Sequence, residues 1–194
     1  MEAGDPLRVP IGATALVFSV AYFVSDAIEA AQGGFSTGQL WLTLIAEVAI
    51  PFFVIGLYMV QRPRIGTLGA WGAGGYAAAY VFFVWTVIYP LVHPVADFDA
   101  LSEIFGIWMF LGGALMVLAG LTFGWATIRA GVLPRWSAAS LMVGVVLVAA
   151  TQGAPEGVQL LAAGIRDLGF AAMGAALLTA GARVRIHRYG EGDA

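Results

Sequence analysis

The sequence predicts an all-α membrane protein with six transmembrane helices. Of its 194 residues, 60% are hydrophobic and only 11% are charged, and the mean hydropathy is +0.88. A helix needs about 17–25 mostly apolar residues to cross the hydrocarbon core of a bilayer, and six segments reach that length. They lie near residues 11–31, 40–60, 68–92, 104–128, 136–152 and 157–182.

Each boundary has a local signal. The segment at 11–31 is interpreted as a first transmembrane helix and not as a cleaved signal peptide, because it is long and Glu2 and Asp5 dilute the basic N-terminus. Residues 62–64 (Arg-Pro-Arg) end the second segment, since proline stops a helix and arginine anchors at the lipid phosphates. Residues 134–136 (Pro-Arg-Trp) precede the fifth segment in the same way.

The remaining polar stretches, 93–103 and 183–194, are too short to fold alone. We therefore expect one transmembrane domain over residues 1–182 and a cytoplasmic tail over 183–194. The tail is rich in arginine and then acidic, which suits a segment that touches anionic lipid head groups.

The arginines predict the orientation, because basic residues in short loops are retained on the cytoplasmic side. The chain has no lysine. The arginines outside the apolar segments all fall on one side of a six-helix arrangement: Arg8, Arg62, Arg64, Arg129, Arg135, Arg183, Arg185 and Arg188. The opposite loops carry only acids: Asp97, Asp99, Glu103 and Glu156. We expect a multi-pass protein of the plasma (inner) membrane with both termini in the cytoplasm.

The composition excludes several function classes. Without cysteine there is no disulfide, no thiolate nucleophile and no cysteine metal site, and without lysine there is no retinal Schiff base. His93 and His187 fall on opposite sides and cannot ligate one haem. The established hydrolase, zinc-protease and nucleotide-binding motifs are missing. Neither a cofactor nor a metal is expected, and nothing supports nucleic-acid binding.

Polar residues inside the predicted helices are the candidates for function, because ionisable side chains in hydrocarbon normally face a partner or a water-filled cavity. With a rise of about 1.5 Å per residue, they all lie in the half of the bundle farther from the cytoplasm. Asp26 and Glu29, spaced i, i+3, share one face of the first helix. The others are Glu47 in the second helix, Arg166 and Asp167 in the sixth, and Gln152 at the end of the fifth.

Arg166 is the only base among these candidates, and we expect it to pair with Glu47 or Asp26. Arg166 and Asp167 diverge by about 100° around the helix, so one is expected to face a carboxylate while the other lines a cavity. Four acids against one base favour a protonated carboxyl or a bound cation. Two simpler interpretations stay open: Asp26 and Glu29 reach interfacial water, or Glu47 and Arg166 form a purely structural pair.

Aromatic residues are further candidates for the lining of this cavity: Tyr80, Trp85, Tyr89 and Trp108. Most aromatic residues near helix ends form an interfacial belt or pack within a bundle. Beside an acidic cavity, their π faces suit a flat, apolar or cationic guest. A carbocation-forming enzyme requires that combination.

The cytoplasmic halves of the helices carry no acidic or basic residue over 48–60, 111–125, 141–148 and 170–178. A proton or ion pathway normally needs polar side chains across the membrane. This pattern favours a pocket open to the outside over an alternating-access transporter.

A GxxxG pattern at Gly120 and Gly124 lets helices approach closely. It serves either packing within the bundle or a homo-oligomer.

Residues 128–136, Ile-Arg-Ala-Gly-Val-Leu-Pro-Arg-Trp, resemble a turn in uncharacterised multi-span proteins common in actinobacteria, which carry a similar R-x-G-[VIL]-L-P-R-W pattern. The resemblance extends to the arginine-only, alanine- and glycine-rich composition, and it implies no activity. The acids on several helices around aromatic residues resemble, more loosely, small membrane terpene cyclases, but no specific motif of that group is present.

The hypothesis from the sequence is a membrane pocket that binds a lipophilic small molecule and performs acid/base chemistry, such as isomerisation or cyclisation of an isoprenoid-like substrate. Asp26 and Glu47 are the catalytic candidates, because a desolvated carboxyl can keep its proton near neutral pH. Arg166 balances their charge, and Glu29, Asp167 and Gln152 line the pocket. The alternatives are a proton- or cation-coupled transporter and a non-catalytic subunit of a membrane complex.

Overall fold

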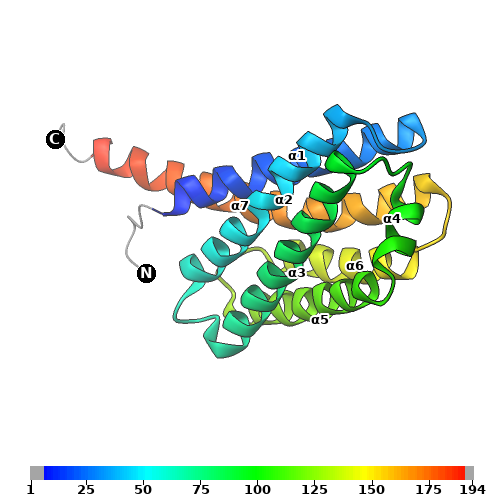
Figure 1. Ribbon diagram of the computed structural model, residues 1–194. Coiled ribbons are helices and arrows are strands. Elements are labelled where there is room, and N and C mark those ends of the chain that lie inside the picture. Colours follow the sequence, from blue (N-terminus) through cyan, green and yellow to red (C-terminus); the bar gives the residue numbers. More distant parts are fainter. Residues whose placement is uncertain (1–6, 191–194) are drawn as a thin grey trace.

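The computed structural model describes the backbone of residues 7–190 and the side chains of residues 7–180. The regular secondary structure of this part of the chain is entirely helical, which confirms the predicted all-α class (Figure 1). Its helices are α1 (Arg8–Gln32), α2 (Thr37–Gln61), α3 (Gly66–Val92), α4 (Phe98–Phe105), α5 (Ile107–Ala130), α6 (Arg135–Ala150) and α7 (Glu156–Gly190).

Five of the described helices are long and apolar enough to cross a membrane, namely α1, α2, α3, α5 and the Glu156–Ala180 part of α7. Large apolar side chains also point outward, with Trp71 80% exposed and Phe52 72% exposed, as expected of a surface that contacts lipid. The chain is therefore a membrane protein. The helix α6 is apolar but has only 16 residues, so its length is about 24 Å.

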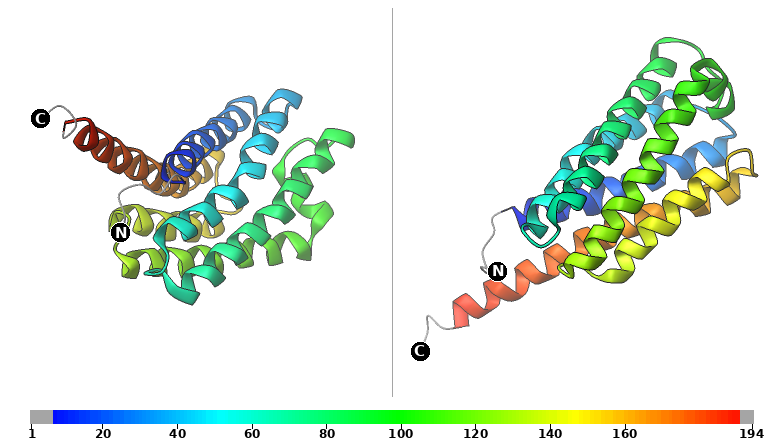
Figure 2. Two further views of the ribbon diagram at one scale, coloured as in Figure 1. Left: turned by 90° about the vertical axis from the view of Figure 1, so that its left-hand side faces the viewer. Right: turned by 90° about the horizontal axis from the view of Figure 1, so that it is seen from below.

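Six helices close into a ring in the order α1, α2, α3, α5, α6, α7, and α7 packs back against α1. Figure 2 shows this arrangement from one end and from below. The short connections make successive helices antiparallel neighbours. The first turn of α1 and the last turns of α7 lie at one end of the ring, and α4 lies at the other (Figures 1 and 2).

Aromatic side chains fill the middle of the ring. Phe170 of α7 packs edge-on against Phe53 of α2, with ring centroids 5.3 Å apart, and against Tyr76 of α3 at 5.4 Å. Tyr76 stacks in turn on Tyr80 at 5.1 Å. These side chains are almost fully buried, so they form a plug that closes the ring toward the end where α1 begins.

Glycines allow the helices to approach closely enough to form the ring. A Cβ atom at Gly12 would lie 2.8 Å from the carbonyl oxygen of Gly174, where α1 crosses α7. At Gly144 of α6, a Cβ atom would overlap the backbone nitrogen and Cα of Arg166 in α7. Backbone contact of this kind needs a residue without a side chain. The position of Arg166 therefore depends on Gly144.

The GxxxG pattern packs within the bundle. A Cβ atom at Gly120 would meet Val145 of α6 at 3.0 Å and Tyr76 of α3 at 3.1 Å, and one at Gly124 would lie 3.1 Å from the carbonyl oxygen of Ala138. The faces of these two glycines are therefore occupied by α3 and α6 of the same chain.

The segment predicted as a helix over 104–128 is divided differently in the structure. Residues 98–105 form the separate short helix α4, which begins where the Asp97 side chain accepts a hydrogen bond of 2.9 Å from the Ala100 N–H. Gly106 has φ +50°, a conformation that glycine adopts at no steric cost, and it separates α4 from α5. The helix α5 therefore begins at Ile107, close to the start that was expected near residue 104.

The last helix also continues past the predicted end at residue 182, to Gly190. Its final turns project beyond the other helices (Figure 2). The side chains of Arg183, Arg185, His187 and Arg188, on which part of the orientation prediction rests, lie outside the described residues.

The close contact at Gly144 generates a first prediction. We expect Gly144→Ala to lower the free energy of unfolding by about 1–3 kcal/mol, the usual cost of overpacking, because α6 must move away from the backbone of α7. The measurement is the melting temperature of the purified protein in mild detergent. The matched control is Gly74→Ala, where the added Cβ meets no atom within 4 Å. An equal melting temperature for both variants would contradict close α6–α7 packing.

Candidate functional site: an acidic cavity at one end of the ring

A cavity of about 660 Å³ lies at the end of the ring that carries α4. Its walls come from the C-terminal halves of α1 and α3, the N-terminal halves of α2, α5 and α7, the end of α6, and α4 itself. The aromatic plug closes its inner end. A cavity of this size is typical of a small-molecule site.

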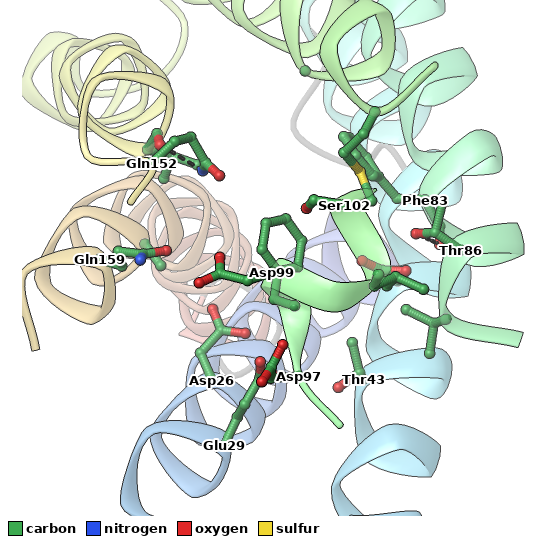
Figure 3. Close-up of a pocket in the computed structure, with 18 of the residues that line it drawn as sticks. Asp26, Glu29, Thr43, Phe83, Thr86, Asp97, Asp99, Ser102, Gln152 and Gln159 are labelled. Carbon is green, nitrogen blue, oxygen red and sulfur yellow. Dashed lines mark hydrogen bonds between the residues drawn. The ribbon is translucent and has the colours of Figure 1, made fainter. Parts of the chain in front are cut away.

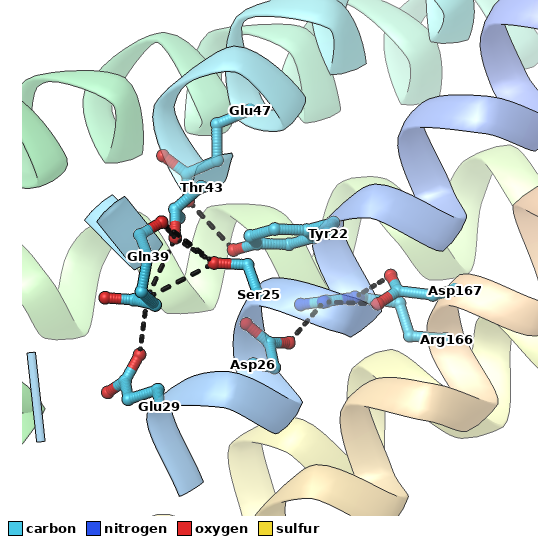
Figure 4. Close-up of polar contacts among 9 residues, drawn as sticks. All are labelled: Tyr22, Ser25, Asp26, Glu29, Gln39, Thr43, Glu47, Arg166 and Asp167. Atoms are coloured by element: carbon cyan, nitrogen blue, oxygen red, sulfur yellow. Dashed lines mark hydrogen bonds and ion pairs between the residues drawn. The ribbon is translucent and has the colours of Figure 1, made fainter. Parts of the chain in front are cut away.

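The wall between α1 and α2 is a connected polar network. The side-chain Nε2 atom of Gln39 shares its two N–H donors among three acceptors, the Oε2 atom of Glu29 at 3.1 Å, the hydroxyl of Thr43 at 2.9 Å and the hydroxyl of Ser25 at 3.3 Å. Ser25 and Thr43 also share a hydrogen bond. Figure 4 shows this network on the face where the two helices meet. Glu29 is thus held at the cavity wall and does not simply extend into interfacial water.

Glu47 lies deeper on the same wall and is only 3% exposed. Its Oε1 atom accepts a hydrogen bond of 2.8 Å from the hydroxyl of Tyr22. Its Oε2 atom is buried and has no hydrogen-bond partner within the described chain. An acceptor that is removed from water without a donor is destabilising, so this oxygen atom is suited to a proton or a donor from a guest.

Arg166 projects from α7 and is the lining residue that carries the positive charge. Its guanidinium group makes two hydrogen bonds to Asp167, Nε to Oδ1 at 2.8 Å and Nη2 to Oδ2 at 3.1 Å. It lies over the Tyr22 ring, 4.7 Å from the centroid, and its Nη2 is 3.7 Å from Oδ2 of Asp26. Two carboxylates and one π face thus compensate a charge that is almost completely buried.

The charge of the lining is strongly unbalanced. Arg166 is the only basic residue among the described lining residues, and they include six acids: Asp26, Glu29, Glu47, Asp97, Asp99 and Glu156. Figure 3 shows the carboxylates of Asp26, Glu29 and Asp99 directed into the space between α1, α4 and α7. Nevertheless, the described residues contain no group of three or more His, Cys, Asp or Glu side chains arranged to hold a metal ion.

The structure brings together most of the polar residues that the sequence singled out. Asp26, Glu29, Glu47 and Arg166 line the one cavity, and so does Gln152, whose amide donates to the Val148 carbonyl oxygen at 2.9 Å. Of the two expected partners of Arg166, the structure selects Asp26; Glu47 is bound to Tyr22.

Asp167 is placed differently from the expectation. Arg166 and Asp167 do not diverge, because the flexible arginine side chain folds back onto its neighbour in two hydrogen bonds. Asp167 therefore balances the charge of Arg166 from behind the wall and is not among the lining residues.

Three predicted aromatic residues also lie away from the cavity lining. Trp85 and Trp108 are 62% and 64% exposed on the outside of the bundle, where tryptophan belongs in a lipid-facing surface. Tyr89 packs against His93 and Phe105 with centroid distances of 4.6 and 5.5 Å. Of the four predicted aromatic residues, only Tyr80 lines the cavity.

Tyr22, Gln39 and Thr43 were not predicted to line the site, although the sequence carries a signal for each. Gln39, Thr43 and Glu47 are spaced i, i+4, i+8, and Tyr22 precedes Asp26 by four residues, so each set shares one helix face. The acids on α4 and at the start of α7, Asp97, Asp99 and Glu156, were assigned to solvated loops. The hydrophobic periodicity of the sequence does not predict that α4 folds over the cavity, because this placement depends on contacts between helices.

The geometry around Arg166 predicts unequal roles for its two acids. We expect Asp167→Asn to cost about 3 kcal/mol of stability, because it weakens a buried bidentate pair. Asp26→Asn should cost less than about 1 kcal/mol, because the Asp26 side chain is 25% exposed and its contact is long. Thermal unfolding of both variants in the same detergent is the measurement. A larger loss of stability for Asp26→Asn would show that Asp26 is the main partner of Arg166, and an equal loss would contradict the unequal roles.

No protein-family model, curated protein sequence or solved structure matches this chain.

Proposed function

We propose that the chain crosses the membrane six times, with both termini in the cytoplasm, and that its cavity binds a lipophilic small molecule on which it performs acid/base chemistry. The observation that carries the proposal is the Glu47 carboxyl group. It is buried at the wall of a cavity of small-molecule size, and one of its oxygen atoms has no partner within the described chain.

The proposed crossing in addition to the five long helices is α6, the fifth in chain order. The helices before and after it both begin at the cavity end, because Met109 at the start of α5 and Glu156 at the start of α7 line the same cavity, while α6 begins near the opposite end of the ring. If α5 and α7 both cross the bilayer, α6 must return the chain between them. Its length of about 24 Å suits a bilayer that is locally thin, or water that enters through the cavity.

The orientation follows from the distribution of charge at the two ends of the ring. Arg62, Arg64 and Arg135 lie at the plugged end, and Asp97 and Glu156 lie at the cavity end. The basic end is retained in the cytoplasm. In a bacterial plasma membrane, the cavity then opens away from the cytoplasm.

The cavity offers an acid and a fixed counter-charge within one wall. Asp26 is held as an ion-pair partner of Arg166, whereas Glu47 has a free oxygen atom. We assign Glu47 as the group that donates a proton to the guest and takes it back, and Asp26 as the carboxylate that stabilises positive charge in the cavity. Isomerisation or proton-initiated cyclisation of an isoprenoid-like molecule is the reaction class that needs both.

The plug favours a pocket over a carrier. Among the described residues, the buried polar side chains at the plugged end are neutral, namely Gln61, Thr127 and Ser137. Transport of protons or cations normally uses ionisable groups across the whole membrane. A carrier would show substrate flux in proteoliposomes that responds to an imposed pH gradient.

The proposed topology makes a prediction that the natural absence of cysteine renders simple to test. In intact cells, a membrane-impermeant maleimide should label Glu103→Cys at the cavity end and should label Arg64→Cys at the plugged end only after permeabilisation. Both positions are exposed. The reverse labelling pattern would show that the orientation is opposite to the proposed one. Labelling of both positions in intact cells would contradict the six-span arrangement, because it would place both ends of α3 on the same side of the membrane.

The proposed chemistry predicts that Glu47→Gln retains the fold and loses turnover. Mass spectrometry of lipophilic molecules that co-purify in mild detergent is the measurement. The wild type should carry one enriched species that is lost or chemically altered in Glu47→Gln. The matched control is Glu103→Gln, an exposed acid at the same end that does not line the cavity, and it should resemble the wild type. Bulk phospholipid alone in all three samples would contradict the proposal.

A further inference from the structure

Most acids of the cavity lack a basic partner. Arg166, the only base among the described lining residues, is already compensated by Asp167 and Asp26. The Glu29 carboxyl group is repelled by the negative charges of Glu156 and Asp97. A carboxylate that is buried at the cavity wall, as Glu47 is, needs a proton or an external positive charge. The negative charge of this wall can therefore be balanced by a bound cation, which the chain itself does not supply.

Two buried oxygen atoms on the same wall point to a ligand independently of this charge count. Oε2 of Glu47 and Oε1 of Gln39 have no hydrogen-bond donor within the described chain, and the two side chains are only 3% and 2% exposed. Both residues line the cavity, and both atoms are acceptors. Gln39 and Glu47 are eight residues apart, which corresponds to about 12 Å along the axis of α2. A guest that carries a donor near Glu47 satisfies the Oε2 atom of that residue.

The rest of the lining defines the chemistry of that guest. The cavity of about 660 Å³ is far larger than a dehydrated metal ion, and the described residues offer no metal-binding group. Tyr80 and Phe83, whose rings pack at 5.6 Å, present aromatic surface that attracts organic cations. Met116 and Val117 of α5 add apolar surface. The combination fits an apolar body with a single positive charge.

We propose that the cavity is a binding site for a lipophilic organic monocation, an amine that is protonated at neutral pH, whose N–H donates to Oε2 of Glu47. The inference rests on the proposed function, because it specifies the charge of the molecule in that same pocket. Transfer of a proton from the Glu47 carboxyl group to a neutral guest leaves a carboxylate and a cation in the same place. A bound cation therefore resembles the state that the proposed chemistry passes through.

The test uses two probes that differ in charge and share one isoprenoid body. Farnesyldimethylamine is protonated at neutral pH, and farnesyl methyl ether is neutral. Each is titrated calorimetrically into the full-length protein in phosphatidylcholine nanodiscs at low ionic strength, with empty nanodiscs as the blank for partitioning into lipid. Glu47→Gln, the exposed lining variant Asp99→Asn and the outside control Glu103→Gln are measured alongside the wild type.

We expect the amine to bind the wild type saturably and at least tenfold more tightly than the ether. Glu47→Gln should weaken amine binding at least tenfold and leave ether binding unchanged. Asp99→Asn, which alters an exposed side chain and tests the charge of the cavity even if Glu47→Gln folds poorly, should weaken the amine about threefold. Glu103→Gln should match the wild type.

The outcomes separate this inference from the function on which it rests. Saturable binding of amine and ether with equal affinity overturns the preference for a cation and leaves the lipophilic pocket intact. Tight amine binding that neither Glu47→Gln nor Asp99→Asn changes places the amine outside this cavity and also overturns the inference. If neither probe binds above the blank, the pocket for an isoprenoid-like molecule fails, and the cation site fails with it.

Discussion

The buried guanidinium group of Arg166 is the interaction on which the rest of the structure depends. A full positive charge inside an apolar bundle is stable only if several groups compensate it, and these groups come from both ends of the chain. Asp167 holds it from α7, while Asp26 and the Tyr22 ring hold it from α1. The same Tyr22 side chain orients Glu47 on α2 through its hydroxyl group. One charge thereby sets the relative positions of three helices and the geometry of the cavity wall.

The ring explains why these polar groups gather at one end. Six helices around a common axis leave space in the middle, and close packing must fill that space or admit water. In the half toward α1's first turn, the aromatic side chains of Phe53, Tyr76 and Phe170 fill it. In the other half, polar side chains such as Glu47 and Arg166 face a cavity among apolar ones, and α4 lies over the opening. The glycine at position 144 brings α6 and α7 close enough to seal the wall beside Arg166.

Much of this arrangement follows from the sequence, and what does not follow has identifiable causes. Long apolar segments and the membrane character could be predicted because hydrophobic length is a local property. Asp26, Glu47 and Arg166 stood out because charge in hydrocarbon is rare. The pairing of Arg166 with its own neighbour depends on a flexible side chain, and the outward direction of Trp85 depends on how α3 is rotated within the ring. The first is a choice of side-chain conformation and the second is a choice of helix orientation, and the periodicity of the sequence determines neither of them.

The closed order of the ring has a consequence for how the protein is made. The contact between α1 and α7 joins two helices that are synthesised at different times, because a chain emerges from the ribosome from its N-terminus onward and five of the described helices lie between these two in the sequence. Until α7 has been inserted, Asp26 and Tyr22 have no Arg166 to bind, and the cavity that Glu47 lines is incomplete. The site is therefore complete only after α7 has been synthesised, and a chain truncated before residue 166 lacks the one base among the described residues that line the cavity.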